Sequence, residues 1–566
     1  MKSLSFIFAG FILSIHFVCP QVINVPADYP AIQQAIDVAS KGDTIIVDEG
    51  IYYENIRFRG KSLVVASKYI LDQDIRYIST TIIDGSKYQN IDSASCVIFE
   101  GEDSLAVLQG FTLQHGMGTV YNLSDLETTT KYDGKMTHEG GGVFFNESNA
   151  ALKNNLIINN QASGISGFAY CGGGGISSFR SNPLISNNVI TGNKAVAENG
   201  TYGYAGALVF NESHGIIRNN IFYDNYTTGR GTVFIDINLS AVFENNTIVG
   251  NTAGRDAPGL FNRTSNTVIR NNLIWGNIGP GAQILGVDND DVFEYCITTD
   301  NIAGDSTILK IFPEFEDEGL RLQNISPCID KGKPDPAFND KEDSSNPGKA
   351  LSPSMGGIRN DIGAYGGPFA GLLPEFSGEN IVIKPVTSYP LALGETFSKS
   401  YIIGNLSTHT IKIDSIIGPQ AAGDLQVISN QENSLINPLE YDTLRLIFTP
   451  THEIKQDDSI LIYHNGYSLS NPIKVSLEVS FVTSLQKPSV MTDKMKIYPN
   501  PASEYIKIET PGCNNPVRMV ILNCSGVEVF EKYVVNNQQI DISKLSDGLY
   551  IVKFDDHLIG RFVKMS

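Results

Sequence analysis

A chain of 566 residues is longer than a single hydrophobic core usually supports, so several domains are expected. The formal net charge of -20 excludes a protein that binds nucleic acid mainly through basic contacts to phosphate. We therefore expect no nucleic-acid partner. The acidic balance suits a secreted protein in contact with calcium or with neutral glycans.

The first predicted element is a signal peptide over residues 1–20. Lys2 precedes an apolar run from Leu4 to Val18, and Pro20 ends that run. The run is too short to span a bilayer, and no later segment is long and apolar enough to do so. We therefore expect export through the periplasm and no transmembrane segment in the mature chain.

The next segment, ADYPAIQQAIDVASKGD, predicts an amphipathic helix. Ile32, Ala35, Ile36 and Ala39 fall on one helical face, and Pro30 stands near the first turn. The phrases DTIIVDEGIYYENI and KSLVVAS that follow predict short strands. We expect the helix to cover the open apolar end of the structure that these strands begin.

One phrase then recurs along the chain at intervals of 26 to 33 residues. Its copies are LKNNLIINN, ISNNVITGN, IIRNNIFYDN, FENNTIVGN and VIRNNLIWGN. The second Asn of each pair serves as a marker, and the five markers are Asn155, Asn188, Asn220, Asn246 and Asn272. The intervals between markers vary, but the spacing inside each copy is fixed.

Three apolar columns stand at fixed offsets from these markers. Twelve residues before the marker lie Val143, Ile176, Leu208, Phe234 and Leu260. Three residues before it lie Leu152, Ile185, Ile217, Phe243 and Ile269. Two residues after it lie Ile157, Ile190, Phe222, Ile248 and Ile274. Three columns predict three short strands in each copy, each strand sending one side chain inward.

The asparagines themselves predict turns and ladders. The Asn pair leaves room only for a tight turn between the second and third strands, and Asn tolerates the left-handed conformation that such a turn needs. A further column is expected to stack as an amide ladder between coils, and it consists of Asn160, Asn193, Asn225, Asn251 and Asn277. A chain that completes three strands per turn is a β-solenoid whose coils rise by about 4.8 Å.

The glycine run at 172–175 raises the alternative of a phosphate-binding loop. Such loops lead into a helix, whose N-terminal amides face the anion. Here a strand follows, and the same position reads GGGVFF before Asn146 and GALVF before Asn211. The glycines are therefore expected to return the chain into the first strand of a coil.

Together these features resemble the right-handed parallel β-helix proteins of the pectin-lyase-like superfamily. The resemblance rests on YPAIQQAIDVASKGDTIIVDEGIYYENI, on the repeated NNxI phrases, and on the closing phrases SPCIDKGKPD and DIGAYGGP. It implies an all-β fold in which residues 21–370 form the β-helix behind its capping helix. The motifs are specific for the fold and say little about activity.

Two further domains are predicted after the β-helix. Residues 371–484 contain alternating strands such as SKSYIIGNLSTHTIKIDSIIGP, which predict a β-sandwich of about seven strands. This segment resembles the immunoglobulin-like modules of large bacterial surface proteins, and we interpret it as a spacer. Residues 485–494 form a polar linker.

Residues 495–566 resemble the C-terminal sorting domain of the type IX secretion system of Bacteroidota. The matching residues are Tyr498, Pro499, Asn500, Pro501, Gly526, Leu545, Gly548 and Tyr550. The resemblance implies a small β-sandwich that contacts the secretion machinery during passage across the outer membrane. It also implies loss of this domain, followed by attachment to surface lipopolysaccharide or by release.

The variation in repeat length falls on one side of the solenoid, at residues 117–141, 161–174, 194–206, 226–232 and 252–258. Insertions on one side usually build a binding face. They carry aromatic and basic residues that suit a sugar, namely Tyr121, Tyr132, Tyr170, Tyr202, Tyr204, Lys194, Arg230 and Arg255. The alternative is that the insertions only cover apolar side chains such as Phe144, Val209, Ile235 and Phe261.

A charged stack is predicted beside these insertions. Glu147, Arg180, Glu212 and Asn238 stand four residues after the inward markers, so adjacent coils would hold them about 5 Å apart. They form either a surface salt-bridge ladder or a catalytic set. The resemblance implies the latter for polysaccharide lyases, in which carboxylates bind calcium and a basic residue removes a proton. Glu147, Glu212 and Asp236 would then hold the metal, with Arg180 or Arg230 as the base.

No motif selects a known enzyme subfamily. The chain lacks the WIDH phrase of pectate lyases, the paired Asp and GHG signature of polygalacturonases, and the core motifs of pectinesterases. A third candidate site is the acidic segment DKGKPDPAFNDKEDSSNPGK with the RNDIGAYGG that follows it. There Asp335, Asp340, Asp343 and Asp361 form either a calcium site or a solvated loop.

We therefore expect a secreted or cell-surface β-helix protein that binds polysaccharide. A polysaccharide lyase and a purely structural or adhesive surface protein are the alternatives.

Overall fold

The computed structural model describes most of the chain. The described residues are 20–122, 136–164, 170–197, 202–236, 240–263, 266–287, 291–300, 307–316, 319–376, 381–385, 397–405, 410–417, 425–428, 434–437, 441–448, 459–465, 472–476, 496–500, 502–509, 517–522, 528–534, 538–554 and 557–565. By internal contacts the chain divides into two units, residues 1–479 and residues 480–566.

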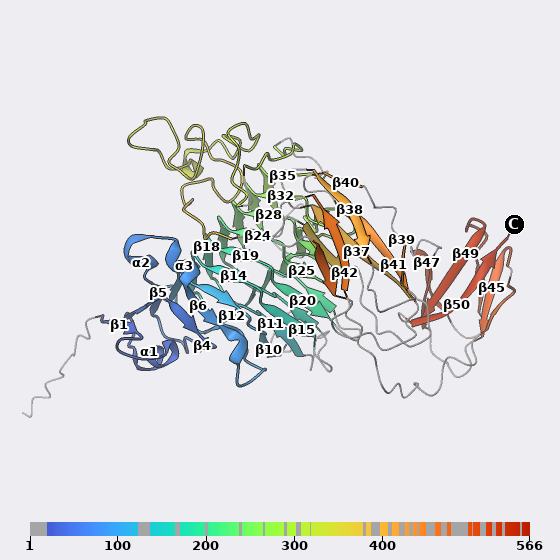
Figure 1. The fold of residues 1–566 in the computed structure, drawn as a ribbon, viewed down its shortest axis with the longest axis horizontal. Helices are drawn as coiled ribbons and strands as arrows, with labels where there is room; N and C mark the ends of the chain where they lie inside the picture. The colour runs from blue at the N-terminus through green and yellow to red at the C-terminus, as the bar shows by residue number, and fades with distance from the viewer. Residues whose placement is uncertain are drawn as a thin grey trace, which may run out of the picture. The chain divides into compact units, whose positions relative to one another are not determined.

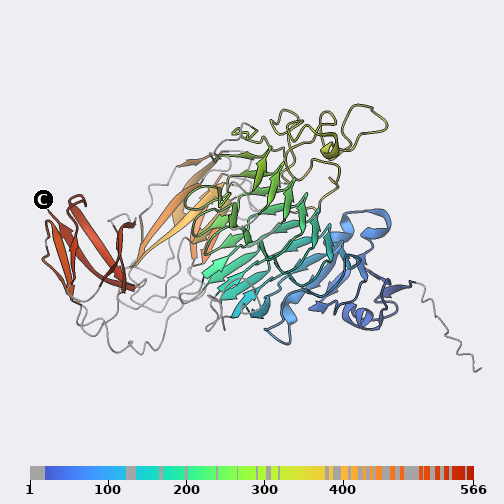
Figure 2. The same cartoon turned by 180° about the vertical axis from the view of Figure 1, so that it is seen from behind.

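Three parallel sheets form a β-helix in which each full coil contributes one strand to each sheet (Figures 1 and 2). Sheet A contains, in order, β1 (Val22–Val25), β2 (Thr44–Val47), β5 (Val64–Ser67), β8 (Val107–Gln109), β13 (Ala151–Lys153), β18 (Leu184–Ser186), β23 (Ile216–Arg218), β27 (Val242–Glu244), β31 (Val268–Arg270) and β34 (Val292–Glu294). Sheet B contains β3 (Gly50–Tyr52), β6 (Thr81–Asp84), β9 (Thr112–Gln114), β14 (Leu156–Ile158), β19 (Val189–Thr191), β24 (Ile221–Tyr223), β28 (Thr247–Val249), β32 (Leu273–Trp275) and β35 (Ile297–Thr298). Sheet C contains β4 (Ile56–Arg57), β7 (Val97–Glu100), β12 (Val143–Asn146), β17 (Ile176–Phe179), β22 (Leu208–Asn211), β26 (Val233–Asp236), β30 (Leu260–Arg263) and β33 (Ile284–Leu285).

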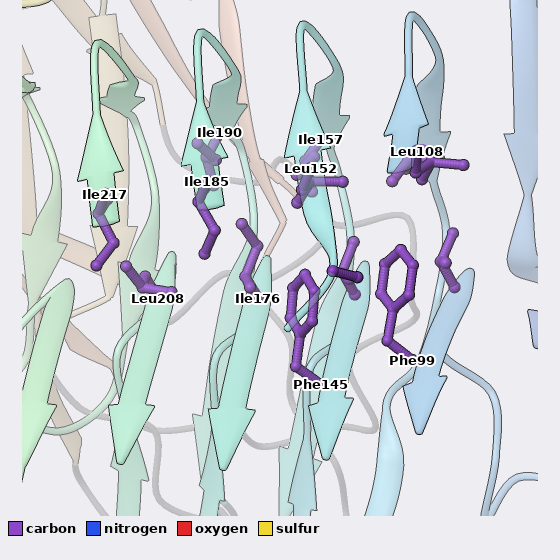
Figure 3. Close-up of a cluster of buried hydrophobic side chains, with 14 of the residues drawn as sticks. Phe99, Leu108, Phe145, Leu152, Ile157, Ile176, Ile185, Ile190, Leu208 and Ile217 are labelled. Atoms are coloured by element: carbon purple, nitrogen blue, oxygen red, sulfur yellow. The ribbon is translucent and has the colours of Figure 1, made fainter. Parts of the chain in front are cut away.

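The predicted apolar columns lie inside this β-helix. Ile185 pairs with Ile217 in sheet A, and Ile190 pairs with Phe222 in sheet B. Both columns are fully buried and belong to one continuous hydrophobic cluster. Figure 3 shows side chains of sheet C, such as Leu208, pointing into the space that these columns share. Burial of stacked apolar columns is the main source of stability of the coils.

One member of the sheet C column is corrected by the structure. Val233, and not Phe234, pairs with Leu208 and points inward, while Phe234 pairs with Val209 and points outward. The connection between β26 and β27 is one residue longer than those of the neighbouring coils. Counting twelve residues back from Asn246 therefore reaches a position one residue too late in β26.

The predicted asparagine ladders are present. The side chain of Asn188 donates from Nδ2 to Asn220 Oδ1 at 3.0 Å, and Asn220 donates to Asn246 Oδ1 at 3.0 Å. Asn193 and Asn225 form the second ladder, with a distance of 3.0 Å between Nδ2 and Oδ1. These amides are buried, and their bonds satisfy polar groups that would otherwise be costly to bury.

The first asparagine of each pair has a separate role. It adopts the left-handed conformation that a tight turn requires, with φ between 51° and 55° in the five copies. Its side chain faces a later segment, residues 360–373, which we call the strap. Asn219 Nδ2 donates to Ala364 O at 3.0 Å and to Gly366 O at 2.7 Å, and Asn187 Nδ2 donates to Phe369 O at 3.2 Å. The strap thus runs back along the turns, toward earlier coils.

The insertions of the repeat build two more sheets instead of irregular loops. Sheet D contains β10 (Thr119–Asn122), β11 (Met136–Glu139), β16 (Tyr170–Gly172) and β21 (Tyr202–Tyr204). Sheet E contains β15 (Gln161–Gly164), β20 (Lys194–Ala197), β25 (Tyr226–Thr227) and β29 (Thr252–Ala253). Every described strand pair in these sheets is parallel except β10 with β11.

Helical segments are few and short. Among the described residues they are α1 (Ile32–Val38), α2 (Tyr69–Asp72), α3 (Arg76–Thr80) and the 3₁₀ turns η1 (Gly85–Lys87) and η4 (Pro336–Phe338). In α1, the residues Ile32, Ala35 and Ile36 are buried in the same cluster as the first coils. The predicted helix therefore exists and turns its apolar face toward the β-helix core.

Residues 381–476 contain two antiparallel sheets of four strands each. The first contains β36 (Ile381–Pro385), β37 (Phe397–Asn405), β41 (Tyr441–Phe448) and β39 (Leu425–Ile428). The second contains β40 (Leu435–Ile436), β38 (Ile411–Ile417), β42 (Ser459–His464) and β43 (Ile473–Ser476). Two sheets are what a sandwich requires, and the likeness to an immunoglobulin-like module stays a prediction.

The C-terminal unit also contains two antiparallel sheets. One contains β44 (Lys496–Tyr498), β45 (Tyr505–Glu509) and β48 (Gln539–Asp541). The other contains β47 (Glu528–Val534), β46 (Val517–Leu522), β49 (Gly548–Phe554) and β50 (His557–Lys564). Ile506, Ile521 and Phe562 are among the buried residues of its core. The unit therefore has a hydrophobic core of its own.

Candidate functional site

The outer face of sheet C carries aromatic side chains. Along each strand of this sheet, the second and fourth residues point away from the core, as the period of a β-strand dictates. Phe144, Phe179, Phe234 and Phe261 occupy such positions and form a second hydrophobic cluster. Tyr121 of β10 packs on Phe179 with ring centroids 4.5 Å apart. The cluster is therefore partly covered by residues of sheet D.

A pocket opens where this cover ends. The hollow itself is shallow, with a cavity volume of about 40 Å³, and the space reaches about 440 Å³ only when the open solvent above it is included. Its apolar and aromatic lining consists of Tyr170, Phe179, Tyr204, Val209 and Phe234. Its polar lining consists of Thr137, Glu139, Asn211, Asp236 and Arg263. Residues from sheets C and D therefore meet in one pocket.

Two tyrosines that the sequence singled out stand in the pocket wall. Tyr170 and Tyr204 lie on adjacent strands, β16 and β21, with ring centroids 5.5 Å apart. The ring centroid of Tyr204 lies 5.2 Å from that of Phe234, and the centroid of Phe234 lies 5.2 Å from that of Phe261. Phe234 and Phe261 are register partners in sheet C, whereas Tyr170 and Tyr204 are diagonal neighbours in sheet D, so the aromatic row crosses from one sheet to the other.

Glu139 at the end of β11 is a pocket residue that the sequence reasoning missed. Its side chain is almost fully buried, and burial raises its pKa to about 7, although hydrogen bonds from Thr137 and Ser177 oppose the shift. Thr137 Oγ1 lies 2.6 Å from Glu139 Oε1, and Ser177 Oγ lies 2.7 Å from Oε2. Its hydrogen-bond partners Thr137 and Ser177 are uncharged hydroxyls, so the ionised form has no neutralising cation in these contacts.

The number of hydroxyl hydrogens available for hydrogen bonds around Glu139 favours the protonated form of its carboxyl group. Thr137 Oγ1 also lies 3.0 Å from the carbonyl oxygen of Tyr170, and one hydroxyl hydrogen cannot serve both acceptors fully. If Glu139 carries a proton, Oε1 can donate to Thr137, which is then free to donate to Tyr170. The geometry and the raised pKa therefore agree that the carboxyl group is protonated below pH 7 and about half protonated at pH 7.

Asp236 and Arg263 form an ion pair at the opposite part of the lining. Arg263 Nε donates to Asp236 Oδ1 at 2.8 Å, and a second contact joins the guanidinium to Oδ2. Asp236 is almost fully buried, whereas Arg263 is half exposed. The arginine thus occupies both oxygens of Asp236, a residue for which the sequence offered a metal-binding role.

Asn211 lies between these groups on β22. The residue is 9% exposed, and among the residues that the structure describes no donor reaches its enclosed Oδ1 atom. A buried carbonyl oxygen without a donor costs free energy. Because Asn211 lines the pocket, a bound molecule that reached this enclosed oxygen with a hydrogen-bond donor would remove that cost.

The predicted charged stack lies one residue beyond the pocket-lining ends of the sheet C strands. Glu147, Arg180 and Glu212 all adopt the left-handed conformation, with φ of 51°, 46° and 45°. Their backbones are joined by the strand ladder, and the side chains of Arg180 and Glu147 form an ion pair. The stack therefore exists as adjacent charged turns, while Asn238 lies outside the described residues.

The remaining basic candidates are dispersed. Lys194 is exposed on β20, and Arg255 is exposed after β29. Arg230 Nε lies 2.7 Å from Asp256 Oδ1, and its guanidinium lies 5.7 Å from the ring of Phe261. None of these three lines the pocket. Tyr132 and the side chain of Tyr202 lie outside the described residues.

The acidic candidates for calcium separate into exposed and buried groups. Asp335 is exposed and caps η4 by accepting a hydrogen bond from the backbone N–H of Ala337 at 3.0 Å. Asp340 and Asp361 are buried, and Asp340 Oδ1 accepts from the N–H of Asp361 at 3.4 Å. Burial raises the pKa of Asp340 to about 8 and that of Asp361 to about 7. Within the described ranges, no group of three or more His, Cys, Asp or Glu side chains is arranged to hold a metal ion.

Comparisons with known families agree with this architecture. Residues 75–306 match the family described as right handed beta helix region. Residues 496–564 match the family described as secretion system C-terminal sorting domain. A search among curated proteins finds no match.

The C-terminal match also establishes location. A sorting domain of this kind marks a protein that is secreted or displayed at the outer-membrane surface, and it implies contact with the secretion machinery. In the part of the chain that the structure describes, no helix has both the length and the apolar character needed to cross a membrane. The chain is thus a right-handed β-helix protein with a C-terminal sorting domain of the type IX secretion system.

Proposed function

We propose that this secreted or cell-surface protein binds polysaccharide in the pocket between sheets C and D. The observation that carries the proposal is an aromatic wall beside buried polar atoms. Tyr170 and Tyr204 flank the pocket, and Asn211, whose enclosed Oδ1 has no donor among the described residues, is part of its lining. Sugars stack their apolar faces on aromatic rings and form hydrogen bonds at their edges. This combination is therefore suited to a glycan.

Eliminative cleavage of a uronate glycan is less well supported. It needs a basic side chain that can abstract a proton beside a neutralised carboxylate. Arg180 is paired with Glu147, and Arg230 is paired with Asp256. Both arginines are therefore engaged as cations, and lyase activity enters only as an outcome of the test below.

The rest of the chain fits a role at the cell surface. Residues 371–484 act as a spacer between the glycan-binding β-helix and the sorting domain. The sorting domain is removed after export, and the mature protein is either attached to surface lipopolysaccharide or released. The supports for this part are the sorting-domain match at 496–564 and the two antiparallel sheets within 381–476.

The proposal is tested by measuring retention of the full-length protein on immobilised polysaccharides, with and without calcium. Tyr204→Ala should weaken retention about tenfold, because it removes one stacking ring. Tyr88→Ala is the matched control, since Tyr88 is an exposed tyrosine outside the pocket lining and should have no effect.

Ultraviolet absorbance of the polysaccharide is followed in the same samples, because β-elimination creates an unsaturated uronate that absorbs there. Absorbance that rises with the wild type and is lost with Arg180→Ala would establish a lyase and overturn the proposal. Neither retention nor cleavage with any glycan would leave a purely structural or adhesive protein.

A further inference from the structure

The charges around the pocket are balanced within the protein. Arg263 pairs with Asp236 in the lining, Arg180 pairs with Glu147 beside it, and Arg230 pairs with Asp256 farther along. Each of these arginines is therefore already matched by a carboxylate. An anionic sugar that entered the pocket would compete with those carboxylates for the same cations.

The opposite wall adds a second obstacle to an anion. Glu139 is a buried residue of the pocket lining, and its hydrogen bonds come from the hydroxyls of Thr137 and Ser177 and not from a cation. The titratable and charged groups that line the pocket with it are Tyr170, Tyr204, Asp236 and Arg263. A carboxylate placed here would share the pocket with Asp236 and would face Glu139, so any negative charge on Glu139 would repel it.

The Oδ1 atom of Asn211, which has no donor among the described residues, determines which chemical group a sugar must present to it. Asn211 Oδ1 can only accept a hydrogen bond, so its ligand has to present a donor. A sugar hydroxyl can donate, whereas an ionised carboxylate can only accept. The carboxyl of Glu139, in either protonation state, and the hydroxyl of Thr137 can in turn form hydrogen bonds with further hydroxyls. Polar recognition in this pocket therefore matches hydroxyl groups.

We propose that the pocket selects a neutral, hydroxyl-rich sugar residue and excludes uronates, with Asn211 as the residue that reads a sugar hydroxyl. This inference rests on the proposed glycan binding and narrows it to one chemical class. Asp236 neutralises Arg263, because it pairs with the cation that would otherwise attract a carboxylate.

The test compares matched oligosaccharides by titration calorimetry with the full-length protein at pH 7. The neutral probes are cellohexaose, xylohexaose and mannohexaose, and the anionic probe is hexagalacturonate. We expect at least one neutral probe to bind and hexagalacturonate not to bind. Preferential binding of hexagalacturonate would overturn this inference while leaving glycan binding intact. Absence of binding to all four probes and to the polysaccharide panel would overturn both.

Two variants examine the named residues. Asn211→Ala should weaken the neutral probe about tenfold, because it removes one buried hydrogen bond. Asn146→Ala is its matched control, since Asn146 also ends a sheet C strand with a buried Oδ1 that no described donor reaches but does not line the pocket. Equal losses in the two variants would contradict a reading role for Asn211.

The Asp236→Asn variant tests whether Asp236 prevents Arg263 from attracting an anionic sugar, because its removal should produce a gain of binding. Asn keeps the shape of the side chain but removes the charge that balances Arg263, so hexagalacturonate should now bind. Arg263→Gln, which removes the cation itself, should show no such gain. A thermal unfolding curve of each variant checks that it is folded. A folded Asp236→Asn variant that still excludes hexagalacturonate would contradict the proposal.

Discussion

Asn219 donates its side-chain amide to the backbone carbonyl of Ala364, which lies 145 residues later in the chain. The same nitrogen donates to Gly366 O at 2.7 Å. Asn219 is the first asparagine of a repeated pair, and its neighbour Asn220 belongs to the buried ladder between coils. The doubled asparagine therefore serves two structures at once, the turn ladder and the strap that lies across it.

This relationship predicts the effect of removing one strap contact. Asn219→Ala leaves the carbonyls of Ala364 and Gly366 without their donor, and the loss should lower the free energy of unfolding by about 1–3 kcal/mol. Asn187→Ala is the matched control, since its single bond to Phe369 O is more exposed and its loss should cost less. Urea unfolding of both variants provides the measurement. An effect of Asn187→Ala equal to that of Asn219→Ala would contradict the role given to the buried pair of bonds.

The inward columns yield a sharper prediction about the core. Ile217 is fully buried in sheet A, so Ile217→Asp would place an unpaired charge in a stacked apolar column. We expect a loss of several kcal/mol, or failure to fold. Ile216→Asp changes the adjacent residue, which is 38% exposed, and should be tolerated. Comparable loss in the two variants, measured by thermal unfolding, would contradict the assigned register.

Much of this fold can be predicted from the sequence because each coil contains a copy of the same repeat. The fixed offsets locate the columns of Ile185 and Ile190 and the ladder of Asn188, since equivalent positions of successive coils meet in a parallel register. The register fails at Phe234 because one additional residue between β26 and β27 shifts the count. A spacing rule cannot detect an insertion that lies inside its own interval.

The site was predictable only in part. Tyr170 and Tyr204 were found because aromatic residues in the insertions suggested sugar contacts. Glu139 was missed because the insertion that carries it resembles no other copy. A signal was nevertheless present, since Glu139, Gly172 and Tyr204 each stand four residues before an inward residue of sheet C and pair in register. The burial that raises its pKa and the opposing hydrogen bond from Ser177 both depend on the stacking of coils, which no local pattern reveals.

The pH dependence of stability follows from the buried carboxyl groups of the strap region. Burial raises the pKa of Asp340 to about 8 and of Asp361 to about 7, well above the value near 3.9 expected in the unfolded chain. A raised carboxyl pKa means that the folded state holds protons which the unfolded state has released. The contribution of these protons to the free energy of unfolding is therefore fully present below about pH 4 and is lost as pH rises through 7 to 8.

Asp340→Asn should flatten this dependence, because an amide keeps the acceptor for Gly367 N–H and does not ionise. Urea unfolding from pH 5 to pH 9 supplies the comparison. Asp343→Asn is the control, because Asp343 is exposed and its pKa is lowered by hydrogen bonds from Ser345. A slope unchanged in Asp340→Asn would contradict the assignment of the buried proton.

Export depends on the C-terminal unit. Deleting the chain from Met495 onward removes the segment that matches the sorting domain, so the truncated protein should accumulate in the periplasm. Cell fractionation with surface proteolysis distinguishes the two locations. Mass spectrometry of the surface form of the intact protein should find a C-terminus near residues 485–495. Normal surface levels of the truncated protein would contradict this prediction.

The central claim, that a glycan binds in the pocket between sheets C and D, is tested most directly by locating a bound sugar. The measurement is a crystal structure of the full-length protein with the oligosaccharide that binds most tightly in solution. We predict a sugar ring stacked on Tyr170 or Tyr204, with a hydroxyl donating to Asn211 Oδ1. A sugar located elsewhere on the β-helix, or on another domain, with this pocket left unchanged, would contradict the account.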